Sequence, residues 1–292
     1  MKGAILPLLV AVILCMGGCS SNLLESVSDD SSREADIESA RMAIDDGDYQ
    51  RAADILEPWY DPLAPDHEIA RILASAYMGK AGIDFTYVLE NSDESDGDSF
   101  DTLASALTLD ITGRARPGSE SGGGRFIVFD SADDMLGDLG KAKEFLDALF
   151  RSHVDNHLAP DQDDIIRMGV ASAAHFIITV GKAAAELNGC NIPVNKYAYR
   201  EIFPDDAGLD ALLDDFSSLI DDPENDTLAS LREDLVQVSA AIDVFDEVLG
   251  PDEDIAREFS DFLSKILGGE TIENFTGINL AGYIRTELLG YN

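Results

Sequence analysis

The stretch Ala171-Ser172-Ala173-Ala174-His175-Phe176-Ile177-Ile178 lies in the most apolar of the helices predicted for the domain. This run lies within a predicted helix from Asp163 to Leu187 that has charged flanks. Its apolar part is too short to span a bilayer, which needs about 20 consecutive apolar residues. A helix that is apolar around most of its circumference is normally buried among other helices. We therefore expect it to be the central helix of a helical bundle.

Further helices are expected on both sides of this central one, because apolar residues recur at helical spacing. Before it, Ser131 is a candidate N-cap for a helix that continues to Phe150. After it, four helices are bounded by Pro, Gly or Asp-Asp: Gly208 to Ile220, Asp226 to Leu249, Asp252 to Leu267 and Ile278 to Leu289. No segment is a convincing sheet. The predicted fold class is all-α.

The first part of the domain, from Arg33 to Leu89, also has helical periodicity. The segment Asp46-Gly47-Asp48-Tyr49 provides a stop and restart between the first two helices, and Pro58, Pro62 and Pro65 end the second one. The apolar positions are Ile37, Ala40, Ala43, Ile44, Ala52, Ile55, Leu56, Trp59, Ile69, Ile72, Leu73, Ala76 and Tyr77. They predict an antiparallel helix pair followed by a third helix.

This part, about residues 34–89, resembles a tetratricopeptide repeat. The residues that carry the resemblance are Ala40, Gly47, Tyr49, Ala52 and Leu56, then Leu73, Ala74 and Tyr77. In such repeats small residues let two helices approach while an aromatic fills the groove to the next pair. Asp36 replaces the first aromatic, and the pattern is lost after Gly82, so the resemblance covers about one and a half repeats. A plain helical hairpin is the alternative. Either reading predicts hairpins that continue into a larger helical bundle or solenoid.

Residues 90–124 interrupt the helical pattern. Residues 91–98 are acidic, but with Gly97 at the sixth position of a calcium loop Leu103 falls at the twelfth, where Glu is needed, so we expect a solvated loop. A helix is expected from about Phe100 to Thr112. The Gly-rich segment 113–124 lacks the Lys-Ser or Lys-Thr of a phosphate-binding loop and is interpreted as an exposed mobile excursion before a short extended segment. Nearby Arg114, Arg116 and Arg125 form the only locally basic spot, which could meet an acidic ligand.

The N-terminus has the layout of a secretion signal, residues 1–18: Lys2, an apolar run from Ala4 to Met16, and two glycines. Met16-Gly17-Gly18-Cys19 resembles the lipobox of bacterial lipoproteins, although Leu is usual at the first position. The resemblance implies that Cys19 is lipidated and anchors the protein in a membrane. A chance Cys near an ordinary cleavage site is the alternative. Ser20 in place of Asp resembles the signal for the outer membrane, and residues 19–33 form a Ser-rich flexible tether to the domain of residues 34–292.

The net charge of −37 excludes nucleic acid and anionic lipid as partners of the domain surface, because both are bound through Lys and Arg. The chain has 38 Asp and 19 Glu against 7 Lys and 13 Arg. Proteins from saline habitats have a similar balance. The acidic surface is therefore explained either by adaptation to salt or by recognition of a partner.

We nominate no catalytic, metal-binding or cofactor-binding residue. His153 and His157 lack the Glu of a zinc-protease helix, since Val154 is in its place, and we expect them at a water-facing helix end. His175 is expected to be a core histidine bonded to a carbonyl. Cys190 has no sequence cue for activation, and with Cys19 lipidated it has no partner for an intrachain disulfide.

These features predict a membrane-anchored, periplasm-facing scaffold that binds a protein, a peptide or a small ligand through its helical repeats. The chain also faintly resembles the helical lipoproteins of tripartite solute transporters, which implies a small-molecule ligand. The alternative is an envelope enzyme of the hydrolase type. An enzyme should have a pocket with converging carboxylates or His, whereas a scaffold should have a groove of aromatics and amides.

Overall fold

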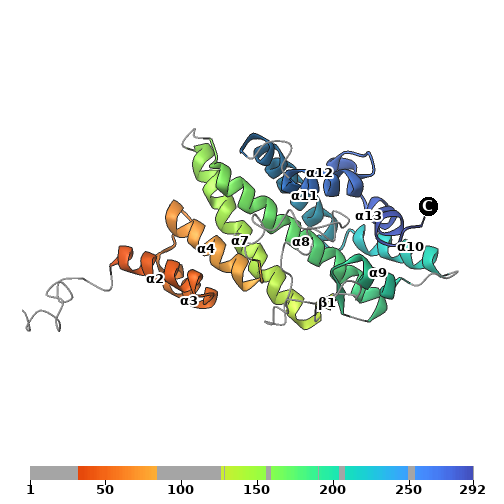
Figure 1. The fold of residues 1–292 in the computed structure, drawn as a ribbon, viewed down its shortest axis with the longest axis horizontal. Helices are drawn as coiled ribbons and strands as arrows, with labels where there is room; N and C mark the ends of the chain where they lie inside the picture. Colours follow the sequence, from red (N-terminus) through yellow and green to blue (C-terminus); the bar gives the residue numbers. More distant parts are fainter. Residues whose placement is uncertain are drawn as a thin grey trace, which may run out of the picture.

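The computed structural model describes residues 32–83, 126–127, 129–155, 159–189, 191–203, 208–248 and 254–291. These residues form an all-α protein, which confirms the predicted fold class. Figure 1 shows a short helical hairpin at one end, two long helices through the middle and a group of shorter helices at the other end.

The N-terminal end consists of α2 (Arg33–Asp45), α3 (Tyr49–Leu56) and α4 (His67–Lys80), with a short 3-10 turn at Glu57–Trp59 between the last two. Gly47 has a φ of 75° in the tight turn before α3. A Cβ atom at Gly79 would lie 2.4 Å from the ring of Tyr49. The ring of Tyr49 therefore packs directly on the backbone of α4.

Two long helices form the middle of the molecule, α7 (Phe129–Asp155) and α8 (Gln162–Asn188). The sequence prediction of Ser131 as N-cap is wrong, because α7 already begins at Phe129 and Ser131 lies in its first turn. Helix α8 begins after the N-cap Asp161, whose side chain accepts a hydrogen bond from the Asp163 amide, and ends at Gly189 in the left-handed region.

The C-terminal part contains α9 (Lys196–Ile202), α10 (Leu209–Ile220), α11 (Thr227–Val248), α12 (Asp254–Leu267) and α13 (Gly277–Tyr283), followed by a π-helical turn at Ile284–Leu288. A short 3-10 turn, Ile272–Asn274, precedes α13. Helices α10, α11 and α12 match their predicted ranges closely. The sequence prediction missed α9 and a two-residue antiparallel pairing of β1 (Phe126–Ile127) with β2 (Ile192–Pro193).

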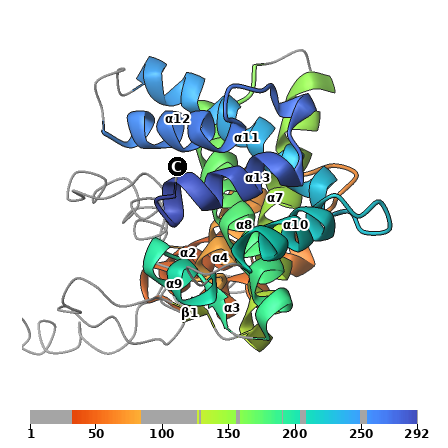
Figure 2. The same cartoon turned by 90° about the vertical axis from the view of Figure 1, so that its right-hand side faces the viewer.

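Helix α8 is the central helix, as expected. It packs against α7, α11, α10, α9 and β2. The contacts α8–α11, α11–α12, α12–α13, α13–α10 and α10–α8 close a ring of helices, which Figure 2 shows along the long axis. Phe176 of α8 meets Phe262 edge to face inside this ring, with ring centroids 5.7 Å apart. Among the described residues α8 is the one helix long and apolar enough to cross a membrane, but most of it is buried within the protein, as for a core helix.

Helix α4 connects the hairpin to this bundle by packing on α7 and by an ion-pair network with α8 in which only Asp164 is fully buried. Arg71 of α4 binds Asp164 of α8 through two nitrogens, at 2.7 and 2.8 Å, and Asp161 at 2.5 Å. Asp164 is fully buried, so the guanidinium is the counter-charge that its burial requires. Its hydrogen bond to Asp164 is the largest cause that raises the pKa of Arg71.

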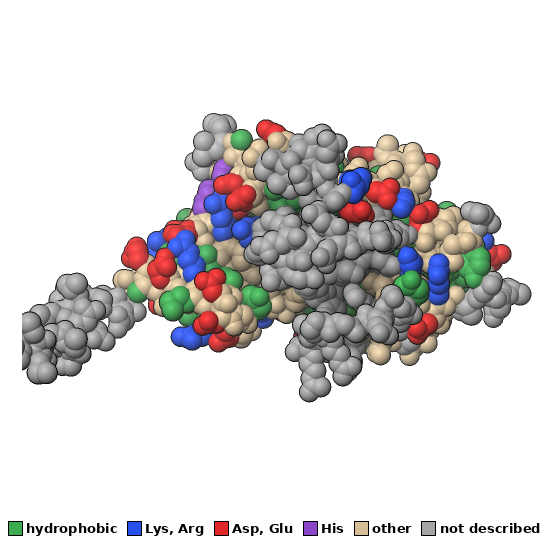
Figure 3. All heavy atoms as spheres, in the orientation of Figure 1, with side chains coloured by type: hydrophobic (Ala, Val, Ile, Leu, Met, Phe, Trp, Pro, Cys, Tyr) green, Lys and Arg blue, Asp and Glu red, His purple; other side chains and the backbone are tan. Residues whose placement is uncertain are grey.

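Acidic side chains lie on both ends of the described surface. Figure 3 shows Asp and Glu on the hairpin end and on the C-terminal helices, with Lys and Arg between them. Several sequence-based expectations lie outside the described residues: the signal peptide and Cys19, the acidic loop, the helix from Phe100, the Gly-rich segment 113–124, His157 and Cys190. Helix α2 begins at Arg33, one residue before the expected start of the domain.

Candidate functional site

Helices α8 and α11 approach each other most closely at Gly169 and Ala241. A Cβ atom built on Gly169 would lie 2.2 Å from the Cβ of Ala241, far inside van der Waals contact. Only glycine therefore fits at this point of α8. The two helices are antiparallel. Six residues after Gly169 on α8, His175 meets Asp234, which lies seven residues before Ala241 on α11.

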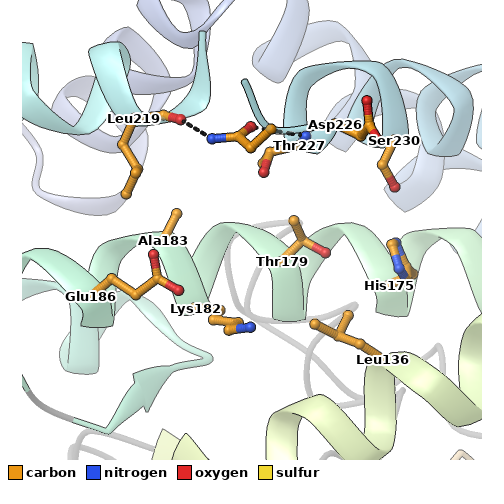
Figure 4. Close-up of a pocket in the computed structure, with 11 residues that line it drawn as sticks. Leu136, His175, Thr179, Lys182, Ala183, Glu186, Leu219, Asp226, Thr227 and Ser230 are labelled. Atoms are coloured by element: carbon orange, nitrogen blue, oxygen red, sulfur yellow. Dashed lines mark hydrogen bonds between the residues drawn. The ribbon is translucent and has the colours of Figure 1, made fainter. Parts of the chain in front are cut away.

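A polar pocket of about 400 Å³ opens between the same two helices, beyond His175. Its main walls are the C-terminal half of α8 and the start of α11, with Leu136 of α7 and Leu219 of α10 at the edges (Figure 4). The lining residues are Leu136, His175, Thr179, Lys182, Ala183, Glu186, Leu219, Asn225, Asp226, Thr227 and Ser230. The volume is in the range of small-molecule sites in proteins.

At one end of the pocket His175 belongs to a largely buried hydrogen-bonded group with Asp234 and Lys143. Nδ1 of His175 lies 2.7 Å from Oδ2 of Asp234, and Nζ of Lys143 lies 2.6 Å from Oδ1 of the same carboxylate. Asp234 is fully buried, and the side chains of His175 and Lys143 are 15% and 12% exposed. Three helices, α7, α8 and α11, each contribute one member.

This arrangement determines which nitrogen of His175 can serve a ligand. A carboxylate accepts hydrogen bonds only, so we assign the hydrogen of the neutral ring to Nδ1. Nε2 is then the nitrogen with a lone pair, and His175 itself lines the pocket. Lys143 supplies Asp234 with a counter-charge on its other oxygen.

Two hydroxyl groups lie next to this imidazole. Thr179 is one turn after His175 on α8, and its Oγ1 is buried without a hydrogen-bond partner among the described residues. Ser230 lines the opposite wall, one turn before Asp234 on the same face of α11 (Figure 4). A buried hydroxyl without a partner costs about 1–3 kcal/mol, and Oγ1 of Thr179 is also inaccessible from the pocket, so the hydroxyl is a cost to the fold and not a contact for a ligand.

The other end of the pocket is charged and more open. Lys182 donates to Asp133 of α7 at 2.6 Å. Glu186 of α8 and Asp226 before α11 line opposite walls, and no Lys or Arg within the described ranges forms an ion pair with either of them. Asn225 is already engaged, because its amide nitrogen donates to the carbonyl of Leu219 and its oxygen accepts from the amide of Thr227.

The structure corrects two expectations about histidines. His175 is paired with a carboxylate, not with a carbonyl, because α11 places Asp234 opposite it. His153 is not at a water-facing helix end: its ring is buried, bonds the Leu149 carbonyl at 2.8 Å and lies 4.6 Å from the ring of His67. No three His, Cys, Asp or Glu side chains in the described part of the chain converge as a metal site.

The sequence contains one sign of the buried contacts of Asp234 that the sequence analysis did not use. Asp234 lies within the apolar stripe Leu231, Leu235, Val238 and Ala241 of α11. A carboxylate on the buried face of a helix needs a cation from elsewhere in the fold. The sequence could not show that Lys143 pairs with Asp234, because the two residues are 91 positions apart along the chain.

The fold and this geometry define an all-α protein with a polar pocket beside its central helix. Comparison with models of protein families, with curated proteins and with solved structures finds no match.

Proposed function

We propose that this protein is a lipid-anchored binding protein of a bacterial envelope, and that its helical domain holds a small polar ligand in the pocket between α8 and α11. The observation that carries the proposal is the pocket of about 400 Å³, with the imidazole of His175, oriented by Asp234, and the side chain of Ser230 on its lining. Preformed pockets with a few well-placed polar groups are typical of ligand sites.

The proposed anchor rests on the sequence of the N-terminus. The apolar run from Ala4 to Met16, the two glycines and Cys19 support lipidation of this cysteine. Several acyl chains at one residue make an anchor effectively permanent. The proposed location is the periplasmic face of the outer membrane, which Ser20 after the cysteine favours. The domain would then stand off the membrane, because its acidic surface repels anionic lipids.

The N-terminal hairpin supports the scaffold part of the proposal. Its helices α2, α3 and α4 pack in sequence order, and the contact of Tyr49 with Gly79 is of the kind used in tetratricopeptide repeats. Helical repeats bind protein or peptide partners through their concave faces. A partner at the hairpin and a small ligand in the pocket are compatible, because the two sites lie on different helices.

An envelope enzyme is the second candidate, and one observation favours it. His175 is held by a buried carboxylate and lines a pocket with Ser230 on the opposite wall. A base oriented by an acid, near a hydroxyl, is the arrangement used in nucleophilic catalysis. Turnover of a generic ester substrate by the wild type, lost in His175→Gln, would support the enzyme and contradict the simple binding protein.

The binding proposal is tested by filling the pocket. Ala183 is buried and lines it, so Ala183→Leu should block the site, whereas Ala229→Leu places the same side chain on an exposed position of α11. Both variants and the wild type are incubated with a small-molecule extract of envelope material and examined by native mass spectrometry. We expect a bound species in the wild type and in Ala229→Leu only. A bound species that survives in Ala183→Leu, or none in any of the three proteins, would contradict the proposal.

The anchor is tested separately by intact mass and membrane fractionation of the protein made in a bacterial host. The wild type and the control Cys190→Ala should be mass-shifted by acyl groups and sediment with membranes. Cys19→Ala should be neither modified nor sedimented. If all three proteins are soluble and unmodified, the chain has no lipid anchor.

A further inference from the structure

The segment between α3 and α4 exposes apolar side chains at the hairpin end of the molecule, where Figure 3 shows such side chains among charged ones. Leu63 is 94% exposed and Trp59 is 41% exposed. Pro62 and Pro65 restrict the backbone on both sides of Leu63. The Leu63 amide also donates to Oδ1 of Asp61 at 2.9 Å, as in an Asx turn. The loop therefore displays this leucine in a defined turn.

This exposed loop lies against the first turn of α2. Nε1 of Trp59 donates a hydrogen bond to Asp36 at 2.8 Å, and Arg33 forms an ion pair with Asp66. Arg33 and Asp36 belong to the first turn of α2, so the loop is held there at both of its ends. Leu63 is four residues after Trp59, a separation that spans at most about 14 Å. The apolar surface is therefore close to the point where the chain enters the domain.

The proposed lipid anchor, on which this inference rests, keeps the same end of the domain near the membrane. Cys19 is 14 residues before Arg33, and 14 residues span at most about 50 Å even when fully extended. The average span of a flexible chain of this length, as predicted for the tether, is about 20 Å. Three other exposed apolar side chains lie on α9, α11 and α13, away from the hairpin (Figure 1): Tyr197, Val236 and Ile278. The anchor therefore favours contact of lipid with this loop over contact with those helices.

The residue types suit the boundary between lipid headgroups and acyl chains. Tryptophan is enriched at this depth, because its ring is apolar and its N–H group needs a polar partner. Asp36 already provides that partner for Trp59, so the exposed part of the ring can leave water without an unsatisfied donor. The side chain of Leu63 is almost entirely in water, so its transfer to acyl chains is favourable.

The charges near the loop determine which lipid it tolerates. Glu57 and Asp61 belong to the same segment. Arg33 is paired with Asp66, and Arg41 is paired with two glutamates, so both arginines are already neutralised by the protein itself. This surface and the net charge of −37 repel anionic headgroups. Zwitterionic headgroups carry no net charge and are the class of lipid that fits.

We propose that the loop of Trp59 and Leu63 is a membrane-contact site, which inserts its apolar side chains into the interface of zwitterionic phospholipid beside the anchor. The contact is weak by itself, because it contains few apolar side chains. The anchor makes it effective, because it raises the local concentration of lipid at the loop. The remaining acidic surface stands off the membrane. The contact therefore orients the domain, which a tether alone does not do.

The fluorescence of Trp59 tests this proposal, because the chain has one tryptophan and its signal reports on this loop alone. The full-length protein, lipidated in a bacterial host, is reconstituted into phosphatidylcholine vesicles with and without brominated acyl chains, which quench tryptophan at close range. Flotation of the vesicles measures how much protein is anchored. We expect brominated vesicles to reduce the fluorescence about two-fold, because the exposed part of the ring lies at the depth of the interface.

A matched pair of variants assigns the quenching to the loop. Leu63→Asp changes a side chain that makes few contacts with the protein, so it should leave the fold intact and abolish the quenching. Ile278→Asp makes the same kind of change at an exposed position of α13 and should be quenched like the wild type. In vesicles that contain the anionic lipid phosphatidylglycerol, the wild type should be quenched less at low salt.

A wild type that floats with the vesicles but has the same fluorescence with and without bromine would overturn the inference and leave the anchor standing. Equal quenching of the wild type and Leu63→Asp would also overturn it, and so would stronger quenching on anionic than on neutral vesicles. Quenching that requires an added fraction of membrane proteins would identify a protein in place of lipid as the partner. A wild type that does not float contradicts the proposed anchor, and the inference falls with it.

Discussion

The imidazole of His175 and the carboxylate of Asp234 are joined by a 2.7 Å contact between Nδ1 and Oδ2, at a point where Asp234 has no exposure to solvent. Lys143 is bound to the other oxygen of the same carboxylate. One acidic side chain of α11 thus holds a lysine of α7 and orients the histidine that lines the pocket.

Removing the charge of Asp234 should destabilise the fold strongly. Asp234→Asn leaves the ammonium group of Lys143 nearly buried without a counter-charge, which costs about 3–5 kcal/mol. Urea denaturation measures the loss. Asp261→Asn, which removes an exposed partner of Lys265, should cost less than about 1 kcal/mol. Lys143→Met combined with Asp234→Leu should recover much of the stability, and equal losses in the two single variants would contradict this account.

The close contact of α8 with α11 should be sensitive to one methyl group. Gly169→Ala forces the helices apart and should cost about 1–3 kcal/mol, as overpacked core substitutions do. Ala241→Gly in the same chain should restore part of the loss. Gly137→Ala, in open space on α7, should instead be neutral or stabilise by up to about 1 kcal/mol. Thermal denaturation compares the four proteins, and a harmless Gly169→Ala would disprove the contact.

The buried Thr179 hydroxyl should reduce the stability of the fold. Thr179→Val has nearly the same shape and removes a buried hydroxyl without a partner among the described residues, so it should stabilise the free protein by about 1 kcal/mol. Thr286→Val, which removes a hydroxyl bonded to the Gly282 carbonyl, should not stabilise. Urea denaturation compares both variants with the wild type, and a destabilised Thr179→Val would contradict the prediction.

The joint between the hairpin and the bundle should weaken in acid. Burial alone would raise the pKa of Asp161, but hydrogen bonds from the Asp163 amide and from Arg71 outweigh it and lower the pKa. A carboxyl group with a lowered folded-state pKa stabilises the fold above its unfolded pKa of about 3.9, and this stabilisation is lost as the pH falls through the folded value. Asp161→Asn, which keeps the helix cap, should therefore lie below the wild type in stability at neutral pH and approach it below about pH 4.

The measurement for this prediction is the free energy of unfolding from pH 7 to pH 2. Asp147→Asn, an exposed change on α7, corrects for the altered net charge. A constant difference between Asp161→Asn and the wild type across this range would show that the ion pair with Arg71 does not titrate as described.

The apolar periodicity of the sequence was sufficient to predict most of the helices. The candidate site, by contrast, depends on how those helices pack in the folded protein. The periodicity of α8 and of α10 to α12 was readable because each of these helices buries one apolar face. The start of α7 was misjudged because Ser131 is a good cap in isolation, whereas the chain continues the helix back to Phe129. The pocket was not readable, since it depends on how α11 lies against α8 after a separation of about 60 residues, as between His175 and Asp234.

The short helix α9 and the pairing of β1 with β2 show the same limit. Lys196–Ile202 is too short for a periodic signal, and its N-cap Asn195 became recognisable only once its side chain was seen to accept from the Ala198 amide. The strands are two residues long and lie 65 positions apart, at Ile127 and Ile192. Sequence patterns of that length occur by chance.

The buried carboxylate of α11 also determines the register in which α7, α8 and α11 can pack. If α8 slid along α11 by one helical turn, about 5.4 Å, His175 would face Ser230 or Val238 in place of Asp234. If α7 slid by the same distance, Lys143 would leave a buried anion behind. A buried charge that loses its partner costs far more than a displaced apolar side chain. The network therefore favours one register of the three helices and destabilises the others.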